Sequence, residues 1–382
     1  MAGYQGWFRC PGDAANQGWV HWSFDSVKIT PDSLSFELWP DVSELSAAEK
    51  FKAPGFMLPS GEPAELFSSD NERTVLRHFE WMRDYDIDGV WLQHFVVDLP
   101  GQPNASRYES RMRVLTHVRK AAIKTGRVWA LSYDIAGAQP ETIYNTITTD
   151  WKHLVDSGVV SDGRYLHNGR VPVVQIWGYY YRNQSNRMTA ELGNRLIDFF
   201  KAPGKYRAYF VGGGDWDWRR NPEPEWQRMF ARMDAYVPWN IGNYSIDRST
   251  GVKSASVGTW EEDRKLCDAR KVLWIPSVYP GFAWDNLMHS KPGTSVIPRR
   301  RGAFFREQFE RLALMKQNTI YVAMFDEVDE GTAIFKVTSN PPTQAHFLGF
   351  EGLPSDAYLN IVKQERAATA QQRKNAEFGD GL

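Results

Sequence analysis

The pattern of apolar and polar positions divides most of the chain into two kinds of segment. In one kind, apolar residues recur every three or four positions, which predicts an amphipathic helix. In the other, a short run is apolar on both faces, which predicts a strand that is buried on both sides. Helices are predicted over residues 71–85, 112–124, 141–157, 190–201, 224–235, 260–270 and 304–317. Strands are predicted over residues 3–8, 89–95, 128–133, 171–177, 207–212, 236–241, 272–278 and from 320 onward.

The alternation of these segments predicts the fold class. Eight strands separated by seven helices, with an eighth helix over residues 356–374, indicate an α/β protein with a closed (β/α)8 TIM barrel. We expect one catalytic domain over residues 1–366, with long βα loops, and a C-terminal tail over 367–382. The irregular segment 9–69 is long enough to be functional, and it contains one strand-like piece at 34–39.

An open, doubly wound sheet is the alternative architecture. Such sheets commonly carry a glycine-rich loop that binds a nucleotide. The candidate here is Gly212-Gly-Gly214, which continues into Asp-Trp-Asp-Trp and matches no phosphate-binding pattern. The barrel is therefore the preferred prediction.

The last predicted strand ends in a run of acidic residues. Residues 320–325 are apolar on both faces, and Asp326, Glu327, Asp329 and Glu330 follow within five positions. Carboxylates this close repel one another, so some keep a proton to higher pH, as a general acid must. An acidic run is often only a solvated loop, but α/β proteins place their chemistry at the C-terminal ends of buried strands. The run is therefore the first candidate site.

Composition narrows the function classes further. A formal net charge of −1 gives no broad electrostatic surface for nucleic acid or for an anionic membrane, and no apolar run is long enough to span a bilayer. Cys10 and Cys267 are too few for a disulfide framework, and their surroundings show no zinc-binding spacing. Aromatic residues make up 14% of the chain, and many lie in loops beside Gly, Asp and Asn. Ring faces in such loops suit sugars, although core packing accounts for many of them.

The residues at the predicted strand ends form a set suited to a carbohydrate. The C-terminal ends of barrel strands share one face, so we expect these side chains to converge there. They are Trp, Tyr, Asn, Gln and carboxylates rather than the groups of a phosphate or hydride-transfer site. The predicted substrate-binding residues are Tyr4, Trp7, Gln93, His94, Asp134, Gln175, Trp177, Asp215, Trp216, Trp239, Asn240, Tyr279, Trp284 and Asp326.

A histidine and an arginine triplet near these strand ends each have a structural and a functional interpretation. His94 has no second histidine at a strand end to complete a metal site, so a packed or hydrogen-bonded histidine is the simpler prediction. The triplet Arg299-Arg-Arg301 is predicted to be solvated surface, with binding of an anionic substituent as the alternative.

The acidic run also carries a resemblance to a known family. Residues 327–334, Glu-Val-Asp-Glu-Gly-Thr-Ala-Ile, resemble the Glu-x-x-Glu-Gly-Thr-x-Ile element of glycoside hydrolase family 99, the endo-α-mannosidases. Residues 4–8 and 279–282 resemble the aromatic first strand and the loop after strand seven of that family. The chain has Asp-Glu-Val at 326–328 where the family commonly has Asn-Glu-Trp, and Asp134 at a strand-three glutamate-type position. It therefore resembles a divergent branch of the family 99 and 71 group.

The resemblance implies a retaining, endo-acting α-glycosidase that uses no metal and no organic cofactor. By position, Glu327 is the base that deprotonates the 2-hydroxyl of the sugar, which attacks C1 to give a 1,2-anhydro sugar. Glu330 is then the acid/base that protonates the leaving oxygen. The axial 2-hydroxyl of an α-mannoside lies anti to the leaving group, so proximity favours internal attack. The implied partner is an oligosaccharide or polysaccharide.

Two functional alternatives stay open at this point. A conventional α-glycosidase acting on another polysaccharide also needs two carboxylates. A carbohydrate-binding barrel without catalysis needs the aromatic residues but not two close glutamates. No leader peptide is visible, so we expect a periplasmic or secreted protein if one was removed and a cytoplasmic protein otherwise.

Overall fold

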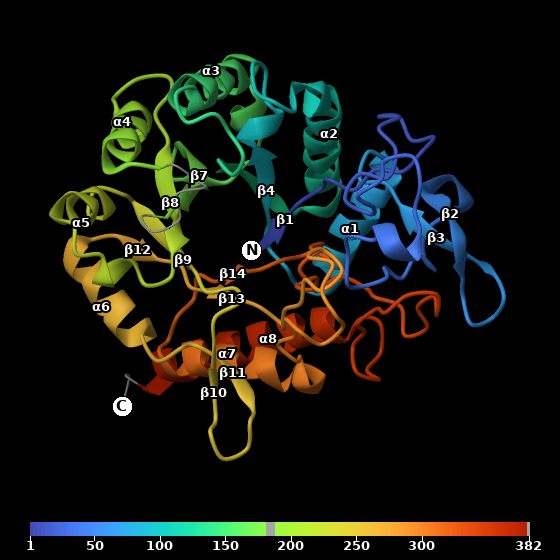
Figure 1. The fold of residues 1–382 in the computed structure, drawn as a ribbon. Coiled ribbons are helices and arrows are strands. Elements are labelled where there is room, and N and C mark those ends of the chain that lie inside the picture. The colour runs from blue at the N-terminus through green and yellow to red at the C-terminus, as the bar shows by residue number, and fades with distance from the viewer. Residues whose placement is uncertain (181–187, 380–382) are drawn as a thin grey trace. The chain divides into compact units, whose positions relative to one another are not determined.

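The computed structural model describes residues 1–180 and 188–379, and the chain divides into two compact units (Figure 1). The first unit comprises residues 89–240 and 258–277 together with Met1. The second unit comprises residues 2–88, 241–257 and 278–382. Each unit has its own strands, helices and buried apolar residues.

The first unit is built on a parallel sheet. Its strand order is β12–β9–β8–β7–β5–β4, and every pairing in that path is parallel. The strands are β4 (Gly89–Phe95), β5 (Val128–Asp134), β7 (Val171–Tyr179), β8 (Tyr209–Asp215), β9 (Ala235–Trp239) and β12 (Leu273–Trp274), and β6 (His167–Asn168) pairs antiparallel with β7. Most residues of β4, β5 and β8 are buried, as predicted for strands covered on both faces.

Helices connect these strands and lie outside them in Figure 1. They are α2 (Tyr108–Thr125), α3 (Ile143–Asp156), α4 (Ala190–Lys201), α5 (Pro224–Phe230) and α6 (Trp260–Arg270). Local signals set their ends: the Thr189 hydroxyl accepts the N–H of Leu192 at the start of α4, and α2 ends at Gly126 with a left-handed φ of 75°. The predicted alternation of strands and helices is confirmed in this unit.

The second unit contains the N-terminal strand and the end of the chain. Strand β1 (Ala2–Tyr4) pairs in parallel with β14 (Tyr321–Val322), and β13 (Ser277–Val278) crosses the sequence boundary of the two units. Two hairpins, β2 (Lys50–Met57) with β3 (Pro63–Phe67) and β10 (Tyr244–Ile246) with β11 (Lys253–Ala255), are antiparallel.

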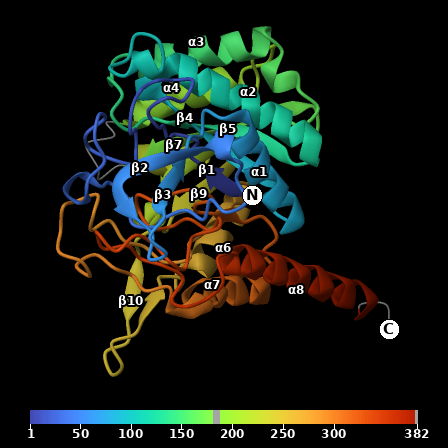
Figure 2. The same ribbon diagram turned by 90° about the vertical axis from the view of Figure 1, so that its right-hand side faces the viewer.

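The helices of the second unit are α1 (Glu72–Asp84), α7 (Ala303–Leu314) and α8 (Ala357–Gly379). Helices α7 and α8 lie side by side in Figure 2. An ion pair of 2.9 Å between Arg306 Nη1 and Glu365 Oε1 joins them, and Arg306 Nη2 donates to Gln364 Oε1 over 2.7 Å. The eighth predicted helix is thus present, and it extends past residue 366.

Three predicted segments differ from the structure, and one hairpin was not predicted, each for an identifiable reason. The strand expected over 3–8 stops at Tyr4, because the N–H groups of Gln5 and Gly6 bind the Asp326 carboxylate instead of a neighbouring strand. The segment 272–278 breaks into β12 and β13 at Pro276, which has no N–H for a ladder. Segment 34–39 forms only isolated bridges. The hairpin of β2 and β3 was not predicted, because half of β2 is exposed and Pro54 interrupts it.

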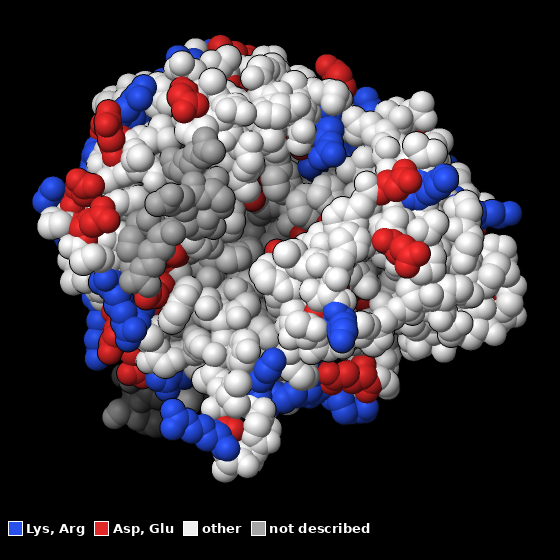
Figure 3. Space-filling view, in the orientation of Figure 1, with Lys and Arg blue, Asp and Glu red and all other residues white. Residues whose placement is uncertain are grey.

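The surface agrees with the near-zero net charge. Figure 3 shows Lys and Arg side chains interspersed with Asp and Glu on the face drawn. Within residues 1–180 and 188–379, no helix is both long and apolar enough to cross a membrane.

Candidate active site

The acidic run forms a buried loop, defined here as residues 326–331. It follows the short strand β14, and the backbone folds back on itself because the Glu327 carbonyl accepts N–H groups from Thr332 and Ala333 over 3.0 and 2.7 Å. Gly331 closes the turn with φ of 61°, a left-handed conformation. A Cβ there would lie 3.2 Å from the backbone nitrogen of Ala283, so this position favours glycine for its conformation and leaves little space for a side chain.

Three of the four carboxylates in the loop are almost fully buried. Asp326, Glu327 and Asp329 are at most 3% exposed, whereas Glu330 is half-buried. The alternative interpretation of the run as a solvated acidic loop is therefore excluded. Buried carboxylates need N–H donors or protons to offset the loss of water.

Backbone and side-chain amide N–H groups donate hydrogen bonds to two of these carboxylates. Asp326 accepts the backbone N–H groups of Gln5 and Gly6 over 2.7 and 2.9 Å. Glu327 accepts the Gln5 side-chain amide over 2.6 Å on one oxygen. Its other oxygen accepts the backbone N–H groups of Asp329 and Glu330 over 2.9 and 3.3 Å. Both carboxylates are thereby fixed in orientation.

Burial also shifts the protonation of the loop. It raises the pKa of Glu330 to about 7. Burial, followed by the negative charges of Glu330 and Asp326, raises the pKa of Glu327 well above its usual range, although the Gln5 hydrogen bond lowers it. Burial and then the charges of Glu327 and Glu330 also raise the pKa of Asp329. Groups this close titrate as a set, and the set retains protons near neutral pH, as general acid catalysis requires.

The loop is held from three further directions. Glu37 N–H donates to the Val328 carbonyl over 2.8 Å, and Ala283 N–H donates to the Glu330 carbonyl over 3.0 Å. The guanidinium of Arg299 donates to the carbonyls of Gly331 and Ala333, each over 2.8 Å. Arg299 is 5% exposed, so the prediction of solvated surface is wrong for this residue: the arginine binds backbone carbonyls from inside the unit.

Two predicted sugar-binding residues lie in the core of the second unit. Tyr4 is fully buried, and its hydroxyl is 2.9 Å from His78 Nδ1. Tyr279 is also fully buried, and its hydroxyl donates to the Asn243 carbonyl over 2.6 Å. The strand-end pattern placed both rings on a sugar-binding wall, but each ring instead fills apolar space while its hydroxyl is satisfied internally.

Two other predicted aromatic residues of the second unit reach the surface. Trp284 is 40% exposed and packs edge-on against Phe282 at 5.1 Å between ring centroids. It follows Ala283, which binds the Glu330 backbone, so the indole belongs to the segment beside the acidic loop. Trp7 is half-buried, and the imidazole of His21 stacks on one of its faces at 3.7 Å.

In the first unit, four predicted residues gather on and just after strands β7 and β9. Trp177 and Trp239 are half-buried and meet edge to face at 5.9 Å. Within the described residues, three buried polar atoms of this group lack a hydrogen-bond partner: Gln175 Oε1, Trp177 Nε1 and Asn240 Nδ2. Buried polar atoms are rarely left unsatisfied, so this group is suited to a polar ligand.

The glycine run of β8 gives this group its space. A Cβ on Gly213 would lie 2.9 Å from Gln175 Nε2 and 3.3 Å from the Trp177 side chain. Residues 212–214, the candidate nucleotide-binding loop, are thus part of strand β8. Because glycine has no side chain, these residues leave room for larger neighbours.

The remaining predicted residues of the first unit divide by burial. His94 Nε2 lies 3.0 Å from Asp150 Oδ2, which also accepts the Tyr133 hydroxyl over 2.7 Å, so His94 is a buried, hydrogen-bonded histidine. Gln93 is buried at the same strand end. The half-buried members are Asp134, Asp215 and Trp216. Within the described ranges, no three His, Cys, Asp or Glu side chains are arranged to hold a metal ion.

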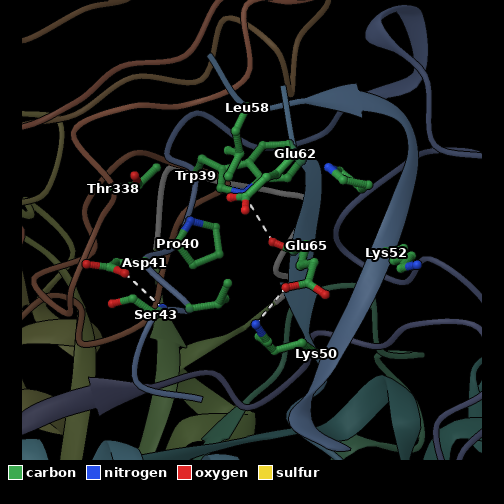
Figure 4. A pocket seen from close by; sticks show the side chains of 12 residues that line it. Trp39, Pro40, Asp41, Ser43, Lys50, Lys52, Leu58, Glu62, Glu65 and Thr338 are labelled. Atoms are coloured by element: carbon green, nitrogen blue, oxygen red, sulfur yellow. Dashed lines mark hydrogen bonds and ion pairs between the residues drawn. The ribbon is translucent and has the colours of Figure 1, made fainter. Parts of the chain in front are cut away.

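A separate cavity of about 470 Å³ lies in the second unit (Figure 4). The ion pair between Lys50 and Glu65, 2.8 Å long, closes one side of it, and the Trp39 indole N–H donates to the Glu65 carbonyl over 3.1 Å. None of the predicted site residues lines this cavity. Its walls are formed by Trp39, Pro40, Asp41, Val42, Ser43, Lys50, Lys52, Leu58, Glu62, Pro63, Glu65 and Thr338.

Comparison with known proteins agrees with the motif in the acidic loop. Residues 240–369, which include Glu327 and Glu330, match the family model described as glycosyl hydrolase family 99. The resemblance to family 99 is confirmed. The match covers the C-terminal part of the chain, where the sequence motif lies.

The relatives with curated descriptions are distant. The glycoprotein endo-alpha-1,2-mannosidase-like proteins of Danio rerio and Homo sapiens are 23% and 25% identical over 124 and 125 residues, which is 32% of this chain. The matched part spans 28% and 27% of the length of those proteins. This low identity is consistent with a divergent relative of family 99.

The fold is shared over almost the whole chain. The family 99 endo-alpha-mannosidase of Bacteroides thetaiotaomicron superposes with a TM-score of 0.69 at 15% identity and covers 98% of both chains. A glycoside hydrolase-like protein gives a TM-score of 0.52 at 13% identity over 90% of this chain and 98% of that protein. The chain therefore has the (β/α)8 barrel fold predicted from the alternation of its segments.

We expect Glu330→Gln to stabilise the protein at alkaline pH but not at acidic pH. The pKa of Glu330 is raised from 4.5 to about 7, so the folded state binds an additional proton between these values, and stability falls as pH rises through them. Glutamine does not ionise. In urea unfolding, the variant should gain roughly 1–3 kcal/mol over the unmodified protein at pH 8 and almost nothing at pH 4. Exposed Glu310→Gln is the control, and an equal gain at both pH values would contradict the assignment.

We expect Arg299→Met to destabilise the protein by about 3 kcal/mol, because two buried carbonyls lose their donor. Arg248→Met, at an exposed position, should change the free energy of unfolding by less than about 0.5 kcal/mol. Urea unfolding at one pH measures both variants. If the two substitutions have equal effects, Arg299 does not support the loop.

Proposed function

We propose that the protein is a retaining endo-α-glycosidase that cleaves an α-mannoside or a similar α-linked glycan. The observation that carries the proposal is the glutamate pair of the buried loop, Glu327 and Glu330, inside the segment that matches family 99. A binding protein gains nothing from crowding four carboxylates into one buried loop, since their repulsion and desolvation oppose folding. A glycosidase needs one carboxylate in each protonation state.

The environments of the two glutamates support unequal roles. Glu327 accepts three N–H groups, which fix its oxygens toward a substrate hydroxyl and partly offset the burial and neighbouring negative charges that raise its pKa. We assign it as the base that deprotonates the 2-hydroxyl. Glu330 is the less buried of the two, and its pKa of about 7 leaves it partly protonated at neutral pH. We assign it as the acid/base that protonates the leaving oxygen and later deprotonates water.

The proposed reaction proceeds in two balanced steps. In the first, the sugar's 2-oxygen loses its proton to Glu327 and bonds to C1, while the C1–O bond to the leaving group breaks and that oxygen takes the proton of Glu330. In the second, water attacks C1 as Glu330 accepts its proton, the bond between C1 and the 2-oxygen breaks, and the 2-oxygen recovers a proton from Glu327. Two inversions at C1 give net retention, and the rigid loop supplies the orientation that the internal attack requires.

Each unit offers sugar-binding groups of its own. Trp284 and Trp7 supply partly exposed ring faces in the second unit. In the first unit, Trp177, Trp239 and the unsatisfied polar atoms of Gln175 and Asn240 supply ring faces and hydrogen-bond groups. Rings and polar groups of this kind suit a sugar, whose C–H faces pack on rings and whose hydroxyls need polar partners.

We expect Trp284→Ala to weaken glycan binding at least fivefold with little change in Tm, because the indole is 40% exposed. Isothermal titration with an α-mannan oligosaccharide measures the affinity. Trp218→Ala is the comparison, since Trp218 is 1% exposed and its removal should cost about 3–5 kcal/mol of stability. Unchanged affinity in Trp284→Ala would remove this residue from the site.

We expect the two glutamate variants to differ in their dependence on the leaving group. Glu330→Gln should reduce turnover of a natural α-mannan oligosaccharide by roughly 10²–10⁴-fold but spare an activated aryl α-mannoside, which needs little protonation. Glu327→Gln should disable both substrates, and a 2-deoxy substrate should be inert with the unmodified enzyme. Initial rates by NMR, which also reports the anomer released, measure these effects, with Glu310→Gln as the control.

Each alternative mechanism predicts a different result from the same measurements. Normal turnover of the 2-deoxy substrate, or rescue of Glu327→Ala by azide to give a β-glycosyl azide, would identify Glu327 as a conventional nucleophile. Release of the inverted anomer would contradict retention. No hydrolysis across a panel of α-glycans, with binding preserved, would identify a non-catalytic carbohydrate-binding barrel.

A further inference from the structure

His21 lies against the acidic loop although it is 308 residues from Asp329 in sequence. Its Nδ1 is 2.9 Å from Asp329 Oδ2. Its ring stacks on the Trp7 indole, with centroids 3.7 Å apart and planes within 7°. The His21 backbone has φ of 63°, which few non-glycine residues adopt, and its carbonyl accepts the Ser35 hydroxyl over 2.9 Å. The imidazole is therefore held in one place by its own backbone, a ring and a carboxylate.

Asp329 depends on this histidine. It is 3% exposed, and within the described residues its second oxygen, Oδ1, is buried without a hydrogen-bond partner. The negative charges around it are those of Glu327, Glu330, Asp326 and Glu37, and all of them oppose its ionisation. Arg299 binds the carbonyls of Gly331 and Ala333 instead. In the tautomer or charge state that places a proton on Nδ1, the His21 ring donates a hydrogen bond to Asp329 Oδ2 and stabilises this carboxylate.

The position of Asp329 also bears on Glu327. The Asp329 backbone N–H donates to Glu327 Oε1 over 2.9 Å, while Gln5 donates to Oε2 over 2.6 Å. Gln5 and Trp7 belong to one short segment, in which the N–H groups of residues 5 and 6 bind Asp326. A continuous set of contacts therefore runs from Trp7 through His21 and Asp329 to Glu327. Displacement of Asp329 would remove one of the donors that aim Glu327.

We infer that His21 is a positioning residue that holds Asp329 in place, so that Glu327 stays aimed and the Trp7 ring stays presented. The expected loss of kcat rests on the proposed glycosidase function. The coupling between His21 and Asp329 does not. Without His21, the buried Asp329 side chain loses this partner, so it holds a proton to still higher pH or turns toward water, and either change moves the loop that carries both glutamates. Misplacement of a catalytic group by about 1 Å can reduce a rate by 10²-fold.

The kinetic test compares His21→Ala, Asp329→Asn and the double variant on the α-mannan oligosaccharide. We expect His21→Ala to lower kcat at least tenfold, and the loss to grow as pH rises from 5 to 8. The side chain introduced by Asp329→Asn is neutral and needs no partner of opposite charge, so the double variant should recover at least fivefold of that loss. His21→Asn, which keeps an N–H donor, should retain more activity than His21→Ala. His153→Ala, at an exposed position of α3, is the matched control.

A second test needs no activity. An unpartnered buried carboxylate destabilises the folded state increasingly as pH rises through its raised folded-state pKa, so His21→Ala should lower Tm more at pH 8 than at pH 5. The same substitution should have almost no effect in the Asp329→Asn background. Additive Tm losses that do not vary with pH, or unchanged kinetics in His21→Ala, would overturn the inference. A panel without hydrolysis would contradict the proposed function alone, while the unfolding cycle would still decide whether His21 and Asp329 are coupled.

Discussion

The burial of several carboxylates in one short loop is the constraint on which the rest of the site depends. Two unit charges 4 Å apart repel by about 4 kcal/mol at the effective dielectric of a protein. Four acidic residues within five positions are therefore tolerated only where donors and protons offset the repulsion. The second unit supplies both: N–H groups from Gln5, Gly6 and the loop itself bind Asp326 and Glu327, and burial raises the pKa of Glu330 to about 7.

The same arrangement explains why the surrounding segments have unusual local structure. The first strand stops at Tyr4 so that the next two N–H groups can bind a carboxylate. A buried arginine satisfies the carbonyls of the turn, and a glycine closes that turn in a left-handed conformation, tightly packed against Ala283. These features oppose regular secondary structure, and each is accounted for by the requirement to bury this loop with its carboxylates and carbonyls hydrogen-bonded.

The sequence predicted those features that depend on local pattern. Helices α4 and α6 and strand β4 have the bounds that apolar periodicity indicated, and the family 99 motif is confirmed by the match to residues 240–369. The sequence pattern could not predict contacts between segments that lie far apart in the chain. Tyr4 and Tyr279 stand at strand ends, as sugar-binding residues do, but only the structure shows that His78 and Asn243 satisfy their hydroxyls inside the core.

Several residues that contact the acidic loop were not predicted from the sequence, because they too depend on contacts between distant segments. Gln5, His21 and Glu37 lie in or near an irregular N-terminal segment, and each contacts the acidic loop, which lies near the other end of the chain. No periodicity reports such a contact. Arg299 stood in a basic triplet, which ordinarily indicates solvent exposure, and its burial became visible only once the carbonyls of the loop were placed. The one available signal was indirect: four close carboxylates require donors from elsewhere in the chain.

The most direct test of this account is the titration of Glu330 itself. Carbon-13 labelling of the glutamate side-chain carboxyls, with the Glu330→Gln variant to assign the signal, would follow its ionisation by NMR from pH 3 to pH 9. The account predicts a midpoint near pH 7, with a linked displacement of the Glu327 signal because the two groups are electrostatically coupled. A Glu330 signal that titrates between pH 4 and 5, as an exposed glutamate does, would contradict the central claim that the loop holds a proton for catalysis.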